Sequence, residues 1–119
     1  MKKAKVVLVV DDDIDFLEEI HALLCERNYT VITCSDPEQV LALTRSYLPD
    51  QIILDLAMPH IRGENLLAVI RKRHPEIPVL ICTGVPNVEV HGLLHNGASG
   101  VFQKPFSSDL LFRTLDQAA

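Results

Sequence analysis

The chain has 119 residues, of which 48% are hydrophobic, and a formal net charge of -5 at pH 7. This length fits one domain with a single core and leaves no room for a second. The acidic balance argues against direct binding of nucleic acid or of an anionic membrane surface. No apolar run approaches the roughly 18 residues of a membrane span, and the start Met1-Lys2-Lys3 does not resemble a signal sequence. We therefore expect a single cytoplasmic domain over residues 1–119.

The chain has three cysteines, Cys25, Cys34 and Cys82. Their odd number and the lack of a Cys-x-x-Cys spacing indicate neither a disulfide framework nor a thiolate metal site. We expect all three to be reduced, small core residues.

Strand-like and helix-like segments alternate along the chain, which predicts βα units. Residues 6–10 are apolar without polar alternation, as in a strand buried on both faces of a parallel sheet. A helix should follow and end near Asn28. Its apolar positions recur at helical spacing: Phe16, Leu17, Ile20, Leu23 and Leu24.

The next unit is a strand over residues 29–34 followed by a second helix. Asp36 can cap the free backbone donors of this helix, and Pro37 suits its first position because proline lacks an N–H. The helix should stop before Pro49.

Three further units complete five strands and five helices. A strand over 51–54 ends on Asp55, and a loop over 57–63 leads into a helix. A strand over 79–82 precedes a weak helix at about 88–96 and a glycine turn. A strand over 101–103 is followed by a last helix, capped within Ser107-Ser108-Asp109.

Polar residues stand at the carboxyl ends of these strands, namely Asp11, Asp12, Asp55, Thr83 and Lys104. If the sheet is parallel, right-handed crossovers bring all five to one edge, where such sheets bind ligands. Crowded carboxylates repel one another unless a cation compensates, and an oxygen-rich site suits Mg²⁺. A divalent ion, a lysine and a hydroxyl around one free carboxylate make a site for a phosphoryl group.

Each residue also has a simpler explanation. Asp11 and Asp12 can cap the next helix and favour its positive end, and capping or a solvated position is the preferred interpretation for Asp13 and Asp15. Thr83 alone is an ordinary strand residue, and Lys104 alone is a surface lysine before a turn. The ordered set favours a functional site over these separate explanations.

The motifs Asp11-Asp12, Leu54-Asp55 with Met58-Pro59 and Gly63, Thr83-Gly84 and Lys104-Pro105-Phe106 occur in this order. Together they resemble a response-regulator receiver domain, with a match over essentially the whole chain. The resemblance implies an α/β, flavodoxin-like doubly wound fold with a parallel five-stranded sheet in the order 2-1-3-4-5.

In such a domain Asp55 would be the phosphoacceptor, a carboxylate nucleophile that attacks phosphohistidine or a small acyl phosphate. The resemblance implies that Asp12, Asp55 and the backbone carbonyl of Ala57 bind Mg²⁺, for which Mn²⁺ can substitute, with Asp11 acting mostly through water. Thr83 would hydrogen-bond one phosphoryl oxygen.

Lys104 would pair with another phosphoryl oxygen as a compact point charge, and Gly84 would leave room for the phosphate. A cis Lys104-Pro105 bond is also implied.

The resemblance further implies a partner, which is a histidine kinase or a phosphotransfer domain. The chain would not be a conventional enzyme but would catalyse its own Mg²⁺-dependent phosphorylation and slow dephosphorylation. Phosphorylation would switch the face formed by the fourth helix and the fifth strand and helix, to control an unknown output partner or attached domain. A stand-alone regulator and a part of a hybrid kinase or longer regulator are both compatible with the sequence.

Two departures from the family pattern bear on this expectation. Val101 stands where many receivers have a tyrosine or phenylalanine, and strand alternation turns the neighbouring Phe102 to the other side, as a core residue. Ala57 and Val85 occupy the positions two beyond the phosphoacceptor and two beyond the hydroxyl residue. Neither side chain can orient an attacking water, which predicts slow self-dephosphorylation.

Two other functions compete with this one. A haloacid-dehalogenase-like phosphatase would use Asp11 as nucleophile in Asp11-Asp12-Asp13, but no Gly-Thr follows and Asp55 would have no role. A phosphorylation-independent interaction module would need lost catalytic residues, and all five are present.

Two metal-site patterns are also weak. His91 and His95 have the spacing of a zinc pair without a third ligand nearby. An EF-hand loop starting at Asp11 fails because Phe16 occupies the required glycine position.

Overall fold

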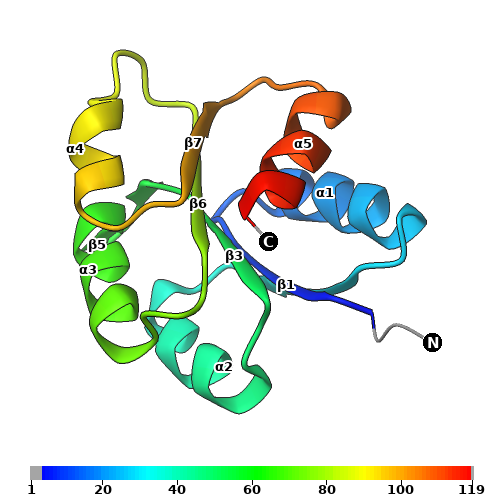
Figure 1. Cartoon of the computed structure of the whole chain (residues 1–119), viewed down its shortest axis with the longest axis horizontal. Coiled ribbons are helices and arrows are strands. Elements are labelled where there is room, and N and C mark those ends of the chain that lie inside the picture. Colours follow the sequence, from blue (N-terminus) through cyan, green and yellow to red (C-terminus); the bar gives the residue numbers. More distant parts are fainter. Residues whose placement is uncertain (1–3, 119) are drawn as a thin grey trace.

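The structure is a computed structural model and describes residues 4–118 (Figure 1). The main sheet has the strand order β2-β1-β3-β6-β7, and every pair in it is parallel. Counted along the chain this order is 2-1-3-4-5, so the predicted flavodoxin-like α/β fold is confirmed. The five strands are β1 (Val6–Val10), β2 (Thr30–Cys34), β3 (Gln51–Leu54), β6 (Val79–Thr83) and β7 (Gly100–Gln103).

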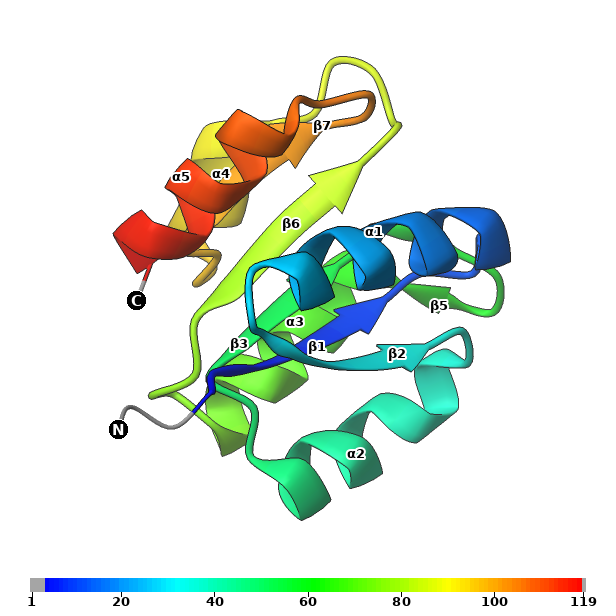
Figure 2. The same cartoon turned by 90° about the vertical axis from the view of Figure 1, so that its right-hand side faces the viewer.

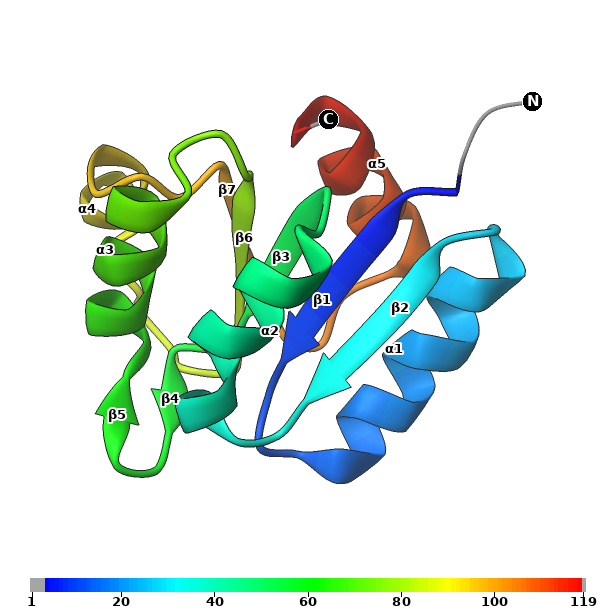
Figure 3. The same cartoon turned by 90° about the horizontal axis from the view of Figure 1, so that it is seen from below.

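Helices cover both faces of this sheet (Figures 1 and 3). One face carries α1 (Ile14–Glu26) and α5 (Ser108–Ala118). The other carries α2 (Val40–Tyr47), α3 (Gly63–Arg73) and α4 (Val90–His95). Each helix is too short or too polar to cross a membrane, within the part of the chain that the structure describes.

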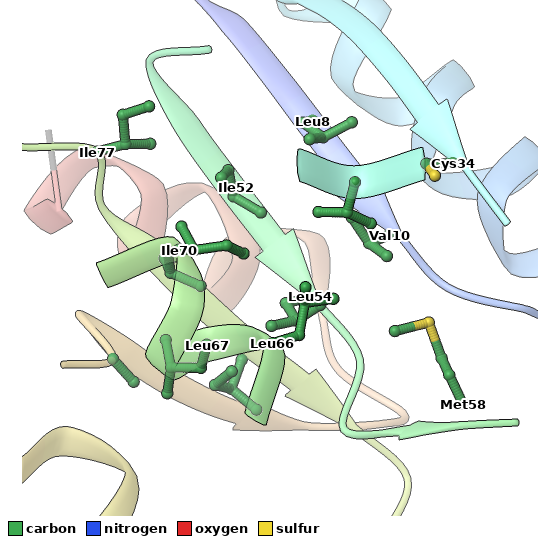
Figure 4. Close-up of a cluster of buried hydrophobic side chains, with 14 of the residues drawn as sticks. Leu8, Val10, Cys34, Ile52, Leu54, Met58, Leu66, Leu67, Ile70 and Ile77 are labelled. Atoms are coloured by element: carbon green, nitrogen blue, oxygen red, sulfur yellow. The ribbon is translucent and has the colours of Figure 1, made fainter. Parts of the chain in front are cut away.

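Alternate strand residues face the two helical layers, which gives two cores. Leu8 and Val10 of β1 pack toward α2 and α3, in the cluster of Figure 4. Val7 and Val9 pack toward α1 and α5. All four are buried, so the strand has no polar side and no polar alternation. Burying each such side chain contributes roughly 1.5–3 kcal/mol.

The helix caps place the acids of the first loop. Asp13 caps α1, and its side chain accepts a hydrogen bond from the Phe16 backbone N–H at 3.2 Å. This confirms the capping interpretation for Asp13 and leaves Asp11 and Asp12 outside that role. Asp36 likewise caps the short 3₁₀ turn (Pro37–Gln39) that leads into α2.

Three expectations about detail need correction. The loop over 57–63 contains a small antiparallel hairpin of β4 (Ala57–Met58) and β5 (Ile61–Arg62), whose strands are too short to show a periodicity. Helix α4 spans only six residues, shorter than the predicted 88–96. The expectation of three core cysteines is wrong for Cys25, which is exposed on α1, whereas Cys34 and Cys82 are buried.

Gly63, at the start of α3, lies against the backbone that carries Asp55. A Cβ atom at this position would stand 2.5 Å from the Leu56 Cα and 2.8 Å from the Asp55 carbonyl oxygen. These atoms are main chain and cannot rotate away, so the turn after β3 needs a residue without a side chain.

Gly63→Ala is therefore expected to lower the free energy of unfolding by about 1–3 kcal/mol, the usual cost of forcing extra atoms into a packed site. Urea denaturation measures this change. Gly84→Ala is the matched control, because a Cβ there would meet nothing within 4 Å. Equal stability of the two variants would contradict the steric explanation.

Candidate functional site

The site lies at the carboxyl edge of the sheet, where the parallel strands end together. The arrowheads of β1, β2 and β6 point to the same side in Figure 2. Asp55 follows β3, and its N–H donates to the Val10 carbonyl of β1 at 3.0 Å. Lys104 follows β7, and its N–H donates to the Thr83 carbonyl of β6 at 2.8 Å. The sheet thus gathers residues that are far apart in the sequence.

Three carboxylates meet at this edge. Asp11, Asp12 and Asp55 each offer an oxygen, and these oxygens lie within 4.8 Å of one another. Asp11 and Asp55 are 1% and 5% exposed, whereas Asp12 is exposed. In residues 4–118 this is the only group of three or more His, Cys, Asp or Glu side chains close enough to hold a metal ion. His91 and His95 are exposed on α4 and belong to no such group.

Asp11 is held by two protein partners. One carboxylate oxygen accepts a hydrogen bond from the Lys104 Nζ at 2.5 Å, and the other accepts from the Asp13 N–H at 2.9 Å. The side chains of Asp11 and Lys104 are 2% and 22% exposed. Their ion pair is largely screened from water, which makes it stronger than a surface pair.

Asp55 is a buried carboxylate that has no ion pair within the described residues. Burial, and to a lesser degree the negative charge of Asp11, raise its pKa to about 6. The Lys104 ammonium and the Ala57 N–H, which donates to Asp55 at 3.3 Å, act in the opposite direction. A carboxyl group in this environment favours a proton or a bound cation.

Lys104 keeps its positive charge despite its partial burial. Burial lowers the pKa of the ammonium, but the hydrogen bond and charge of Asp11, with the charge of Asp55, raise it above its ordinary value. Burial also raises the pKa of the neighbouring Cys82 thiol to about 12. This cysteine is therefore an uncharged packing residue and not a nucleophile.

Thr83 is fully buried at the end of β6. Its hydroxyl oxygen accepts a hydrogen bond from the Val85 N–H at 3.1 Å, which leaves the hydroxyl proton free to be donated. The Val85 carbonyl in turn accepts from the Gln103 side chain at 2.8 Å. Thr83 is thus linked to β7 through the loop that follows β6.

One residue near the site was missed by the sequence analysis as a candidate. The Lys104 Nζ lies 4.0 Å from the centre of the Phe16 ring, over its face. Phe16 shows only the helical spacing of an apolar position, and no sequence signal connects it to a residue so far along the chain. The structure also has the cis Lys104-Pro105 bond that the family resemblance implied.

Comparisons with known proteins agree with this architecture. The family model of the response regulator receiver domain matches residues 7–116. The receiver domain of NtrX from Brucella abortus superimposes with a TM-score of 0.88 at 30% identity, covering 94% of this chain and 96% of that one. For the chemotaxis protein CheY4 of Vibrio cholerae the TM-score is 0.89 at 28% identity, covering 98% of this chain and all of that one.

The curated relatives are longer proteins. The nitrogen assimilation regulatory protein NtrX of Azorhizobium caulinodans is 31% identical over 115 residues, which are 94% of this chain and 25% of the relative. A hybrid signal transduction histidine kinase D of Dictyostelium discoideum is 34% identical over 109 residues, 89% of this chain and 7% of the relative. The chain therefore spans well under half the length of these relatives.

The doubly wound parallel sheet, with its acidic cluster at the carboxyl edge, and the match to the receiver family model together define the class of this protein. This chain belongs to the response regulator receiver domain family of two-component signalling.

The raised pKa of Asp55 predicts the effect of removing its charge. With a chelator present, Asp55→Asn is expected to raise the free energy of unfolding by about 1–3 kcal/mol near neutral pH. The folded-state pKa of about 6 exceeds the ordinary value of 3.8. The stability that the protonated group contributes is therefore complete below about pH 4 and lost as the pH rises through about 6.

Asparagine does not titrate, so the difference in free energy of unfolding between the two proteins should disappear below about pH 4. Urea denaturation over a pH series measures it, with the exposed Asp15→Asn as the matched control. A gap that is absent near neutral pH, or that does not change with pH, would contradict this explanation.

Proposed function

We propose that this receiver domain accepts a phosphoryl group on Asp55 from the phosphohistidine of a histidine kinase or phosphotransfer domain, in a cytoplasmic, Mg²⁺-dependent reaction. The observation that carries the proposal is the position of Asp55. It is a nearly buried carboxylate beside Asp11 and Asp12, in the field of the Lys104 ammonium, at the edge where such sheets bind ligands.

In the proposed step, an oxygen of the ionised Asp55 carboxylate attacks the phosphorus atom in line. The bond from phosphorus to the imidazole nitrogen breaks, its electron pair stays on that nitrogen, and an acyl phosphate forms on Asp55. A small acyl phosphate would serve in the same way, with a carboxylate as leaving group. Such transfers depend mainly on positioning and on neutralisation of charge.

The residues fit a hard divalent cation. The donors are oxygens, three carboxylates lie close together, and the pKa of Asp55 is raised by burial and by the negative charge of Asp11. Asp12, Asp55 and the Ala57 carbonyl would hold Mg²⁺, or Mn²⁺ in its place, and Asp11 would act through water. When bound, the ion supplies neutralisation of the charge on the phosphoryl oxygens.

Two side chains would bind the phosphoryl oxygens that the metal does not reach. The Thr83 hydroxyl has a proton to donate to one oxygen, and the Lys104 ammonium would pair with another. Lys104 is already held at the edge of the site by its contact with Asp11, and its charge reaches Asp55.

The output would follow from the engagement of the Thr83 hydroxyl with the phosphoryl group. Val101 is half-buried beside α4 and has no ring to move inward, and Phe102 is buried on the opposite face, as predicted. The hydrogen bonds from Thr83 through Val85 to Gln103 offer another connection to the face of α4, β7 and α5. This face would control a partner or an attached domain.

The phosphatase alternative is disfavoured by the contacts of its nucleophile. Asp11 is 1% exposed and both of its oxygens already accept hydrogen bonds. Asp55 accepts only one long bond, from Ala57, among the described residues. A phosphorylation-independent interaction module is the remaining alternative, and phosphorylation itself tests it.

Incubation with acetyl phosphate and Mg²⁺ is expected to add one phosphoryl group, observed by intact-protein mass. Asp55→Asn and a chelator should each abolish the adduct, because one removes the nucleophile and the other the cation. No adduct on protein shown to bind Mg²⁺ would favour the interaction module. An adduct that survives Asp55→Asn but is lost in Asp11→Asn would favour the phosphatase-like mechanism.

The phosphorylated domain is expected to lose its phosphate slowly. Ala57 and Val85 are both exposed, and neither side chain can form a hydrogen bond to a water molecule. Ala57→Asn should shorten the lifetime of the acyl phosphate roughly 10- to 100-fold by orienting that water. The measurement is decay of the adduct with Mg²⁺ present, and Ala68→Asn on the exposed side of α3 is the control. A lifetime of only seconds in the unmodified protein would contradict this prediction.

A further inference from the structure

The Lys104 ammonium lies between two different groups. One is the Asp11 carboxylate, with an oxygen 2.5 Å from Nζ, and the other is the face of the Phe16 ring, whose centre is 4.0 Å away. This ring distance is well within the roughly 6 Å over which an aromatic face attracts a cation. The attraction is strengthened where water is partly excluded, and the Lys104 side chain is only 22% exposed.

The Phe16 ring is itself fixed by other aromatic rings. It meets Phe106 edge to face, with centres 6.1 Å apart and planes at 78°. Phe106 meets Phe102 in the same way at 4.8 Å and 86°, and Phe102 is buried in the core. The orientation of the ring under Lys104 is therefore tied to the sheet through two edge-to-face contacts.

A ring and a carboxylate restrain an ammonium with different consequences. A second carboxylate would neutralise Lys104 and accept another of its three donors. A ring face accepts no conventional hydrogen bond and leaves the net charge unchanged, so the ammonium remains available to a phosphoryl oxygen. The ring also lines a surface pocket of about 440 Å³ together with Lys104, Pro105 and Phe106.

We propose that Phe16 is a positioning residue for phosphotransfer to Asp55: the face of its ring holds the Lys104 ammonium beside the phosphoacceptor without neutralising its charge. This inference rests on the proposed phosphorylation of Asp55. It adds a residue of α1 to the site and makes the electron density of its ring, and not only its volume, a determinant of the rate.

The competing explanation is that Phe16 is only an apolar residue packed against Phe106. Ring volume and ring electrostatics are separable, because fluorination withdraws electron density from the face of the ring with little change of shape. A packing role would be insensitive to this change. If the ring holds a cation, each added fluorine should weaken that contact further.

The experiment uses the full chain with Phe16 replaced by phenylalanine carrying one, two or three ring fluorines, and by leucine. Initial rates of phosphorylation by acetyl phosphate at saturating Mg²⁺ are measured by intact-protein mass. We expect the rate to fall stepwise with each fluorine. The total loss should be roughly 2- to 30-fold, the range of a cation–π contact, and Phe16→Leu should show a similar loss.

The matched control is the same fluorine series at Phe112, whose ring lies under Arg27 and stacks on Tyr29, away from the site. Its rates should equal those of the unmodified protein. Flat rates across the Phe16 series, or an equal decline at Phe112, would overturn the positioning role while leaving phosphorylation of Asp55 intact. Failure of the unmodified protein to be phosphorylated would overturn both proposals.

Discussion

The site depends on an excess of negative charge, which arises because the sheet brings several carboxylates together at one edge. Parallel strands end at one edge, so residues placed just after β1 and β3 must lie close to one another. Asp11, Asp12 and Asp55 are brought together in this way, and Lys104 is the lysine that the fold places among them. One ammonium cannot neutralise three carboxylates. Burial and this imbalance together raise the pKa of Asp55, and burial is the larger cause.

The choice of partner by the Lys104 ammonium also matters for the site. Lys104 is hydrogen-bonded to Asp11 and reaches Asp55 only through its field. Asp11 is therefore neutralised by an ion pair and nearly buried, whereas Asp55 has no cation in direct contact among the described residues. This difference between neighbouring carboxylates supports the proposal that Asp55, and not Asp11, is the nucleophile.

The fold was predictable because its signals are local. Residues 6–10 and 52–54 are apolar on both sides, which indicates buried parallel strands, and Asp13 and Asp36 stand where helix caps are needed. The clustering of the site residues at one edge could also be predicted, because it follows from the parallel topology. The side-chain partners did not follow, because contacts such as Lys104 with Asp11 or with Phe16 depend on tertiary distances that no spacing encodes. The expected burial of Cys25 was wrong for a related reason, because the sequence does not show which way a cysteine near a helix end faces.

The resting contacts also constrain how the site would respond to a phosphoryl group. A phosphoryl group on Asp55 would bring strong acceptors next to Lys104, in competition with Asp11. If the ammonium moves toward it, Asp11 becomes a nearly buried carboxylate without its partner, which is costly unless a cation compensates. The metal would then have two tasks, which are to neutralise the phosphoryl oxygens and to offset the charge that Lys104 leaves behind. The proposed Mg²⁺ requirement would in this way follow from the movement of one lysine as much as from the chemistry of transfer.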